Sequence, residues 1–149
     1  MEIIEGDLLD YCTPFTYIAH QCNCKSKTPK HLSYHVFKRF PHANIYNGPQ
    51  KYVRNPGTII VKGTVVNVLA QYNPGKARGI DGEWYPQRRI WLKMALDKIL
   101  ENKEIKTIYF PWGMSCGAAG DDWDKVLPIF EEFNEKMSKE GRKAAFIKL

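Results

Sequence analysis

The chain has 149 residues, of which 44% are hydrophobic and 26% charged, and its formal net charge is +6. These values exclude a disordered or low-complexity chain, and the length suits a single domain, residues 1–149. The chain has no apolar run of the ~18 residues that a membrane helix needs and no secretory signal at its acidic N-terminus, so we expect a cytoplasmic protein with free thiols and no membrane partner.

Apolar residues recur with both strand and helix periods along the chain. The elements that they predict are strands at 2–5 and 16–22, a helix at 31–40, a hairpin of strands at 58–61 and 64–70, a helix at 88–100, a strand at 105–110, a helix capped by Asp121 and a strand at 144–148. Strands that alternate with helices in this way are typical of an α/β fold with a mixed sheet. Ligands bind such sheets beyond the carboxyl ends of the strands, so we expect the site at two loops, 21–31 and 111–123.

The charge is unevenly distributed. Between Tyr11 and Ile80 the chain has ten lysines and arginines and no acidic residue, whereas the remainder has twelve basic and sixteen acidic residues. A basic block of this kind indicates an anionic partner such as a nucleotide, a nucleic acid or a membrane surface. A solubilising surface without a ligand is the alternative.

The second of the two loops, which we call the glycine loop (Pro111–Trp123), combines three glycines with two alanines. Small residues between a strand and a helix let backbone N–H groups approach a phosphate closely. The loop lacks the Gly-Lys-Ser/Thr of a Walker A motif, and its glycine spacing is not that of the dinucleotide fingerprint. The alternative is that the glycines only permit a tight turn between the strand and the helix.

The other loop, which we call the first loop (Gln21–His31), follows a strand that ends in polar residues. It is basic and leads into a helix N-terminus, which favours an anion through partial charge and free N–H groups. His20 is a candidate acid, base or nucleophile and Asn23 a candidate binder of hydroxyl groups. A structural hydrogen-bonding role is the alternative for His20.

A metal site would have to use His20 with Cys22, Cys24 and Cys116. The Cys-x-Cys spacing is not that of a zinc knuckle, and no second cysteine pair follows. We therefore expect neither a metal nor a cofactor, and interpret the cysteines as small thiols.

Together these motifs resemble the macro domain family, whose members bind ADP-ribose and its derivatives. The resemblance covers nearly the whole chain and rests on the order of short motifs: Glu5-Gly6-Asp7-Leu8-Leu9, Ala19-His20-Gln21-Cys22-Asn23, Phe40-Pro41, and Phe110-Pro111 before the glycine loop. The second motif is similar to a divergent branch that includes ADP-ribose-1''-phosphate phosphatases and virus- and phage-type macro domains. The resemblance implies a three-layer α/β/α sandwich around a central mixed sheet.

The resemblance also implies how the ligand is bound. Asp7 would accept a hydrogen bond from the adenine amino group, which suits a carboxylate, and Leu8 would line the same pocket. Asn23 would bind the distal ribose, and Tyr72 would flank the distal ribose or the adenine. The backbone amides that would wrap the diphosphate are those of Ser115, Cys116, Gly117, Ala118, Ala119 and Gly120.

The first loop departs from the family pattern. Where the family has a run of glycines, this chain has Pro29-Lys30-His31-Leu32-Ser33. Pro29 has no N–H to donate and His31 adds bulk, so Lys25, Lys27 or Lys30 would supply the charge instead.

The catalytic residues of two branches are also missing. The lysine and aspartate of members that hydrolyse protein-linked ADP-ribose are absent, with Tyr72 and Ala119 near their places, and so is the carboxylate proposed for the phosphatases. His20 does match a histidine implicated in the phosphatases.

Three hypotheses follow from the sequence. The first is recognition of ADP-ribose or a phosphorylated or acylated derivative, with hydrolysis of ADP-ribose-1''-phosphate through His20 as nucleophile or general acid if the protein is an enzyme. The second is a binding module without turnover. The third is nucleic-acid binding through the basic segment and its aromatic residues.

Overall fold

The computed structural model describes residues 1–149 and has the order of elements that the sequence predicts. The strands are β1 (Glu2–Glu5), β2 (Tyr17–Cys22), β3 (Thr58–Lys62), β4 (Val65–Leu69), β5 (Thr107–Pro111) and β6 (Lys143–Lys148). The helices are α1 (Leu32–Arg39), α2 (Tyr85–Glu101) and α3 (Trp123–Lys139), with short 3-10 turns η1 (Leu8–Tyr11), η2 (Pro41–Ala43) and η3 (Ile80–Gly82). No helix combines the length and the apolar character that crossing a lipid bilayer requires.

The six strands form one mixed sheet in the order β1-β6-β5-β2-β4-β3. Only β3, at one edge, is antiparallel to its neighbour, and the other five strands are parallel. The carboxyl ends of β1, β6, β5, β2 and β4 therefore lie at the same edge of the sheet, which is where α/β proteins bind ligands.

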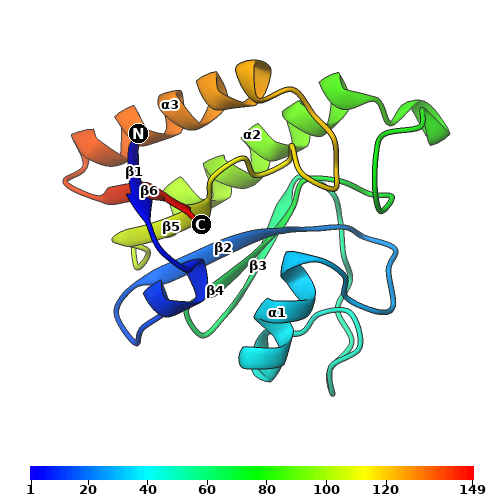
Figure 1. Cartoon of the computed structure of the whole chain (residues 1–149), viewed down its shortest axis with the longest axis horizontal. Helices are drawn as coiled ribbons and strands as arrows, with labels where there is room; N and C mark the ends of the chain where they lie inside the picture. The colour runs from blue at the N-terminus through cyan, green and yellow to red at the C-terminus, as the bar shows by residue number, and fades with distance from the viewer.

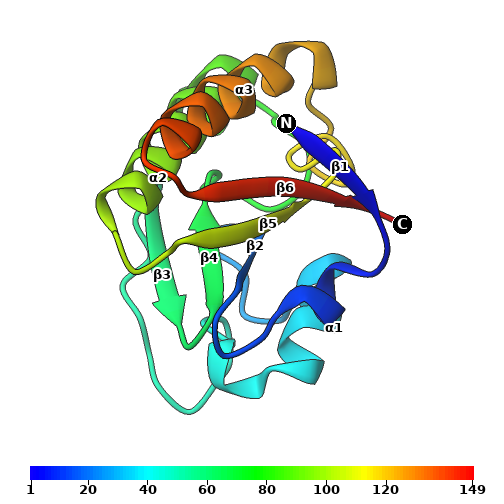
Figure 2. The same cartoon turned by 90° about the vertical axis from the view of Figure 1, so that its left-hand side faces the viewer.

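Helices cover both faces of the sheet (Figures 1 and 2). The helices α2 and α3 lie side by side across one face, and α1 covers the other near β2 and β4. This arrangement confirms the predicted three-layer sandwich with a central mixed sheet.

The core is divided by the sheet into two apolar clusters. Successive side chains of β2 alternate between them, because a strand has a period of two: Ile18 packs toward α1 and Ala19 toward α2 and α3. On the larger side, the buried ring of Phe110 packs edge-on against those of Phe130 and Phe133, at centroid distances of 5.1 and 5.6 Å.

Two helix starts differ from the sequence prediction. The helix α2 begins at Tyr85 rather than Arg88, because Pro86 fits the first turn of a helix, where its missing N–H costs no hydrogen bond. The cap of α3 is Asp122, whose side chain accepts from the Asp124 N–H at 3.0 Å, and not Asp121. Asp121 instead pairs with Arg89 of α2.

We expect Phe110→Ala to lower the free energy of unfolding by about 4 kcal/mol, because it removes a fully buried ring that packs against Phe130 and Phe133 and leaves a cavity in the core. Urea denaturation followed by circular dichroism measures this. Phe15→Ala is the matched control, since that ring is 86% exposed and its removal should change stability little. Equal losses for the two variants would contradict this description of the core.

Candidate functional site

Four segments meet at the edge formed by the carboxyl ends of the parallel strands. They are the turn at Asp7 after β1, the glycine loop after β5, the first loop after β2 and the segment of residues 70–84 after β4, which we call the β4–α2 loop. The spatial order of these segments along the edge follows the strand order β1-β6-β5-β2-β4. The segments therefore form a row rather than a ring.

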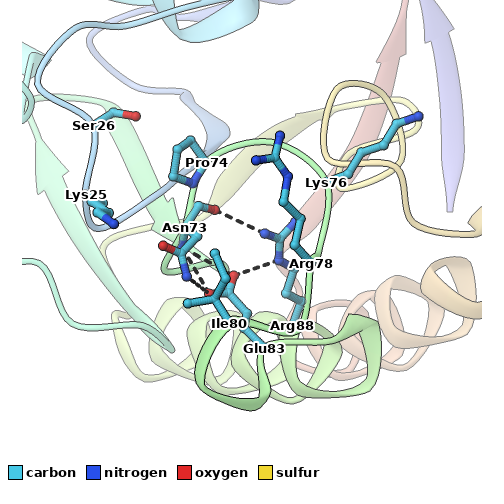
Figure 3. A pocket seen from close by; sticks show the side chains of 9 residues that line it. All are labelled: Lys25, Ser26, Asn73, Pro74, Lys76, Arg78, Ile80, Glu83 and Arg88. Atoms are coloured by element: carbon cyan, nitrogen blue, oxygen red, sulfur yellow. Dashed lines mark hydrogen bonds and ion pairs between the residues drawn. The ribbon is translucent and has the colours of Figure 1, made fainter.

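A cavity of about 300 Å³ lies at the β4 end of this row, between the first loop and the β4–α2 loop (Figure 3). Its lining is polar and basic, and two segments distant in sequence contribute to it. The lining residues are Lys25, Ser26, Asn73, Pro74, Lys76, Arg78, Ile80, Glu83 and Arg88.

A buried ion pair between Glu83 and Arg88 forms the floor of the cavity (Figure 3). The Arg88 Nε lies 2.8 Å from the Glu83 Oε2, and each side chain is only 4% exposed. Glu83 also accepts hydrogen bonds from the backbone N–H groups of Tyr72 and Asn73, while Arg88 donates to the carbonyl oxygens of Asn73 and Gly75. The pair thus fixes the backbone on which the cavity is built.

Hydrogen bonds between polar side chains link the glycine loop, the first loop and the β4–α2 loop. The Ser115 hydroxyl donates to the Gln21 Oε1, the Gln21 Nε2 donates to the Gln71 Oε1 at 2.6 Å, and the Gln71 Nε2 donates to the Asn73 carbonyl at 2.8 Å. Gln71 and Gln21 follow neighbouring strands, and Ser115 lies in the glycine loop. These hydrogen bonds hold the loops in one arrangement relative to each other.

The glycine loop offers a subset of the six predicted amides to a ligand. The N–H groups of Cys116 and Gly120 bond within the loop, to Gly113 and Gly117, whereas those of the other four residues donate to no protein acceptor: Ser115, Gly117, Ala118 and Ala119. The loop is anchored behind by Asp121, which binds Arg89 through both carboxylate oxygens at 2.7 and 3.0 Å. This pairing raises the pKa of Arg89.

The two residues predicted to hold adenine lie in different environments: Asp7 is exposed and Leu8 is buried. Asp7 is exposed, and its Oδ1 accepts from the Leu9 N–H at 3.0 Å, so it caps η1 at the start of the row. Leu8 is 5% exposed and belongs to the apolar cluster under α1. Its side chain therefore packs in the core and supports the turn from behind.

Asn23 and Tyr72 lie next to each other across the first and β4–α2 loops, because the Cys24 N–H donates to the Tyr72 carbonyl at 2.9 Å. The Asn23 Oδ1 accepts from the N–H groups of Lys25 and Ser26, which leaves its amide nitrogen for a ligand. The Tyr72 ring is 43% exposed.

His20 lies inside the protein rather than in the row. Its ring has no exposed surface and packs edge-on against Phe37 of α1. The Asn67 Nδ2 donates to two backbone carbonyls, so its Oδ1 accepts from the His20 Nε2–H at 2.6 Å, and the Nδ1 faces the Ser33 hydroxyl at 3.0 Å. Both ring nitrogens are occupied, an arrangement that matches the structural alternative rather than attack on a ligand.

The cysteines are not activated nucleophiles. Burial raises the pKa of the Cys22 thiol to about 12, and desolvation likewise raises that of Cys24 to about 11 and that of Cys116 to about 12. No group of three or more histidine, cysteine or acidic side chains is arranged to hold a metal ion.

Sequence reasoning did not find the elements that build the cavity. It missed the Glu83–Arg88 pair and the link between Gln21 and Gln71, and it counted Lys76 and Arg78 in the basic segment without assigning them to a site. One signal was available: Asp81 and Glu83 are the first acidic residues after the basic segment, and an arginine follows five residues later.

The fold is shared with solved macrodomains. The chain is similar to the macrodomain of Thermus aquaticus DarG, with a TM-score of 0.63, 17% identity and 98% of this chain and 96% of that one covered. The chain is also similar to the macrodomain of Mycobacterium tuberculosis DarG, with a TM-score of 0.66, 14% identity and 98% of this chain and 96% of that one covered. A macrodomain protein of Streptomyces coelicolor matches with a TM-score of 0.55 and 17% identity over 98% of both chains. No protein-family model and no curated sequence matches the chain. The chain therefore has the macrodomain fold, as its motifs predicted.

We expect Glu83→Gln to lower the free energy of unfolding by about 3 kcal/mol, because it leaves the Arg88 guanidinium buried without a charge partner. Chemical denaturation measures the loss. Asp10→Asn is the control: it breaks an ion pair with the same 2.8 Å separation that is exposed, to Arg39, and should cost little. The double variant Glu83→Gln/Arg88→Met should lose less than the sum of the single variants, and additive losses would contradict a coupled pair.

The burial of His20 predicts a pH dependence of stability. Desolvation lowers the pKa of His20 from 6.5 to about 4, and the hydrogen bond with Asn67 offsets only part of this effect. Between these values the unfolded chain binds a proton that the folded chain excludes. The folded state should therefore lose up to about 3 kcal/mol as the pH falls from 6.5 to 4.

Unfolding free energies of the wild type and His20→Gln across this range test the effect, and the variant should have the flatter profile. His35→Gln removes an exposed histidine and should keep the wild-type slope. In the wild type, NMR should show the His20 ring protonating only near pH 4. Protonation of the His20 ring near pH 6.5 in the folded protein would contradict this explanation of the pH dependence.

Proposed function

We propose that this protein binds ADP-ribose or a derivative of it along the row of loops. The observation that supports this most is the order of the polar groups along the sheet edge: Asp7 after β1, the free amides of the glycine loop after β5, and Asn23 after β2. A base, a diphosphate and a second sugar occur in the same order along ADP-ribose. Four strand spacings of ~4.8 Å give the row a length of about 19 Å from β1 to β4, so it suits an elongated ligand.

Each position has the chemistry for its part of the ligand. The exposed Asp7 carboxylate accepts from an amino group, and the amides of Gly117, Ala118 and Ala119 donate to phosphate oxygens without losing a protein partner. The amide nitrogen of Asn23 donates to a ribose hydroxyl. The basic first half of the chain adds attraction for the two phosphate charges.

Binding without turnover fits the geometry better than hydrolysis. The residue predicted as the nucleophile, His20, is buried with both ring nitrogens engaged. The one carboxylate that lines the cavity, Glu83, is paired with Arg88 and accepts three N–H groups besides. Neither group is placed to donate a proton to a phosphate ester or to attack it.

Isothermal titration calorimetry with ADP-ribose and with AMP tests the proposal. ADP-ribose should bind at least about tenfold more tightly, since AMP lacks the second phosphate and the second sugar. Gly117→Val should reduce its affinity at least about tenfold, because the added side chain covers the free amides. The fold should tolerate this variant, since nothing lies within 4 Å of a Cβ at Gly117 and its φ is not positive.

The matched pair Asp7→Asn and Asp10→Asn then tests the adenine end. Both remove one acidic charge from the same turn, but only Asp7→Asn should weaken both ADP-ribose and AMP. Unchanged affinity in Gly117→Val, or no measurable binding by the wild type, would contradict the proposal.

A phosphate-release assay with ADP-ribose-1''-phosphate distinguishes a binding module without turnover from a hydrolase. We expect binding without release. Release that disappears in His20→Ala, while ADP-ribose still binds, would establish the hydrolase instead.

A further inference from the structure

An irregular segment between η2 and β3 contacts the first loop at Asn23. This segment, which we call the η2–β3 segment, covers residues 44–57. Its Tyr46 hydroxyl accepts a hydrogen bond from the Asn23 N–H at 2.8 Å, and its Arg54 Nη1 donates to the Asn23 carbonyl oxygen at 3.3 Å. Two side chains from one distant segment thus bind both backbone polar groups of a single residue of the first loop.

These two side chains are themselves held in place. The Arg54 guanidinium lies over the Tyr46 ring, 5.0 Å from its centroid, and forms no salt bridge with a carboxylate. The Tyr46 ring also packs edge-on against Phe37 of α1, at a centroid distance of 5.5 Å. The Tyr46 N–H donates to the Asn44 Oδ1 at 2.9 Å. Tyr46 is therefore fixed through both its ring and its backbone.

The contacts of Asn23 leave one of its polar groups without a protein partner. Tyr46 and Arg54 bind its backbone groups, and its Oδ1 accepts from the N–H groups of Lys25 and Ser26 at 3.0 and 2.7 Å. Because the Oδ1 faces these two N–H groups, the Nδ2 of the same planar amide faces the other way. The direction in which the Nδ2 donates is thus set by how the Asn23 backbone is held.

We propose that Tyr46 and Arg54 are positioning residues, which aim the Asn23 amide nitrogen at the second sugar of the ligand and so set the preference for ADP-ribose over AMP. This inference rests on the proposed function for the role of Asn23. A hydrogen bond weakens steeply when its donor angle falls below about 120°, so a small tilt of Asn23 loses the bond to the sugar. Tyr46 and Arg54 act through Asn23 and not by touching the ligand.

Calorimetry with ADP-ribose and AMP on Tyr46→Phe tests the inference. This variant removes the hydroxyl that holds Asn23 and keeps the ring that packs on Phe37. ADP-ribose should bind about fivefold more weakly, as for the loss of one hydrogen bond, and AMP, which has no second sugar, should change less than about twofold. Arg54→Met should lower the same ratio of affinities, and Arg54→Lys, which keeps a donor, should lower it less. Equal weakening of both ligands in Tyr46→Phe would overturn the inference.

Tyr52→Phe is the matched control, and Asn23→Ala shows whether Tyr46 acts through Asn23. Tyr52 lies in the same segment, but its hydroxyl donates to the exposed Gln50 Oε1 at 3.0 Å, so its loss should change neither affinity more than about twofold. In the Asn23→Ala background, Tyr46→Phe should weaken ADP-ribose no further. Equal losses in the two tyrosine variants, or losses that multiply in the double variant, would each contradict the positioning role.

Amide hydrogen exchange in the free protein, measured by NMR, separates this inference from the proposed function. In Tyr46→Phe the N–H groups of Lys25 and Ser26, which donate to the Asn23 side chain, should exchange at least about fivefold faster, and in Tyr52→Phe they should not. If they do not respond to Tyr46→Phe, the positioning role is wrong even if ADP-ribose binds. If they respond but the wild type does not bind ADP-ribose, Tyr46 does position Asn23 and the proposed function fails.

Discussion

The buried pair of Glu83 and Arg88 is the constraint on which the site depends. A long loop between a strand and a helix leaves many backbone groups to satisfy, and this pair satisfies those of Tyr72, Asn73 and Gly75 with two side chains. Desolvating two charges is costly unless each also makes further hydrogen bonds, and here each does. The loop can therefore carry exposed cations on a rigid base.

The loops of the site are coupled to one another as well as to the sheet. The hydrogen bonds from Ser115 through Gln21 to Gln71 connect segments that lie 94 and 50 residues apart in sequence. Arg89, next to Arg88 on α2, holds Asp121 at the end of the glycine loop. The start of α2 thus anchors two loops, and these contacts hold the loops in one geometry relative to each other.

The sequence predicted the fold and the order of elements because both depend on local patterns. Strand and helix periods identify β2 and α3 directly. The cavity, in contrast, is lined by side chains that are distant in the sequence, such as Lys25 and Lys76, and no short motif encodes their proximity. His20 illustrates the difference. Its motif marks the end of β2, but the two-residue period of the strand turns its ring toward Phe37 in the core.

The first loop holds a residue other than glycine in a backbone conformation that favours glycine. His31, at the start of α1, has a φ of 56° and a ψ of −133°, a conformation that glycine adopts at little cost and that strains other residues. The resemblance places a glycine run here. The turn therefore has a conformation that suits glycine but carries the side chain of His31, and Pro29 has no N–H to donate. The β4–α2 loop contributes Lys76 and Arg78 to the lining of the cavity. The buried Glu83–Arg88 pair fixes the backbone that carries these side chains, and side-chain charges at fixed positions discriminate between anions by geometry as well as by charge.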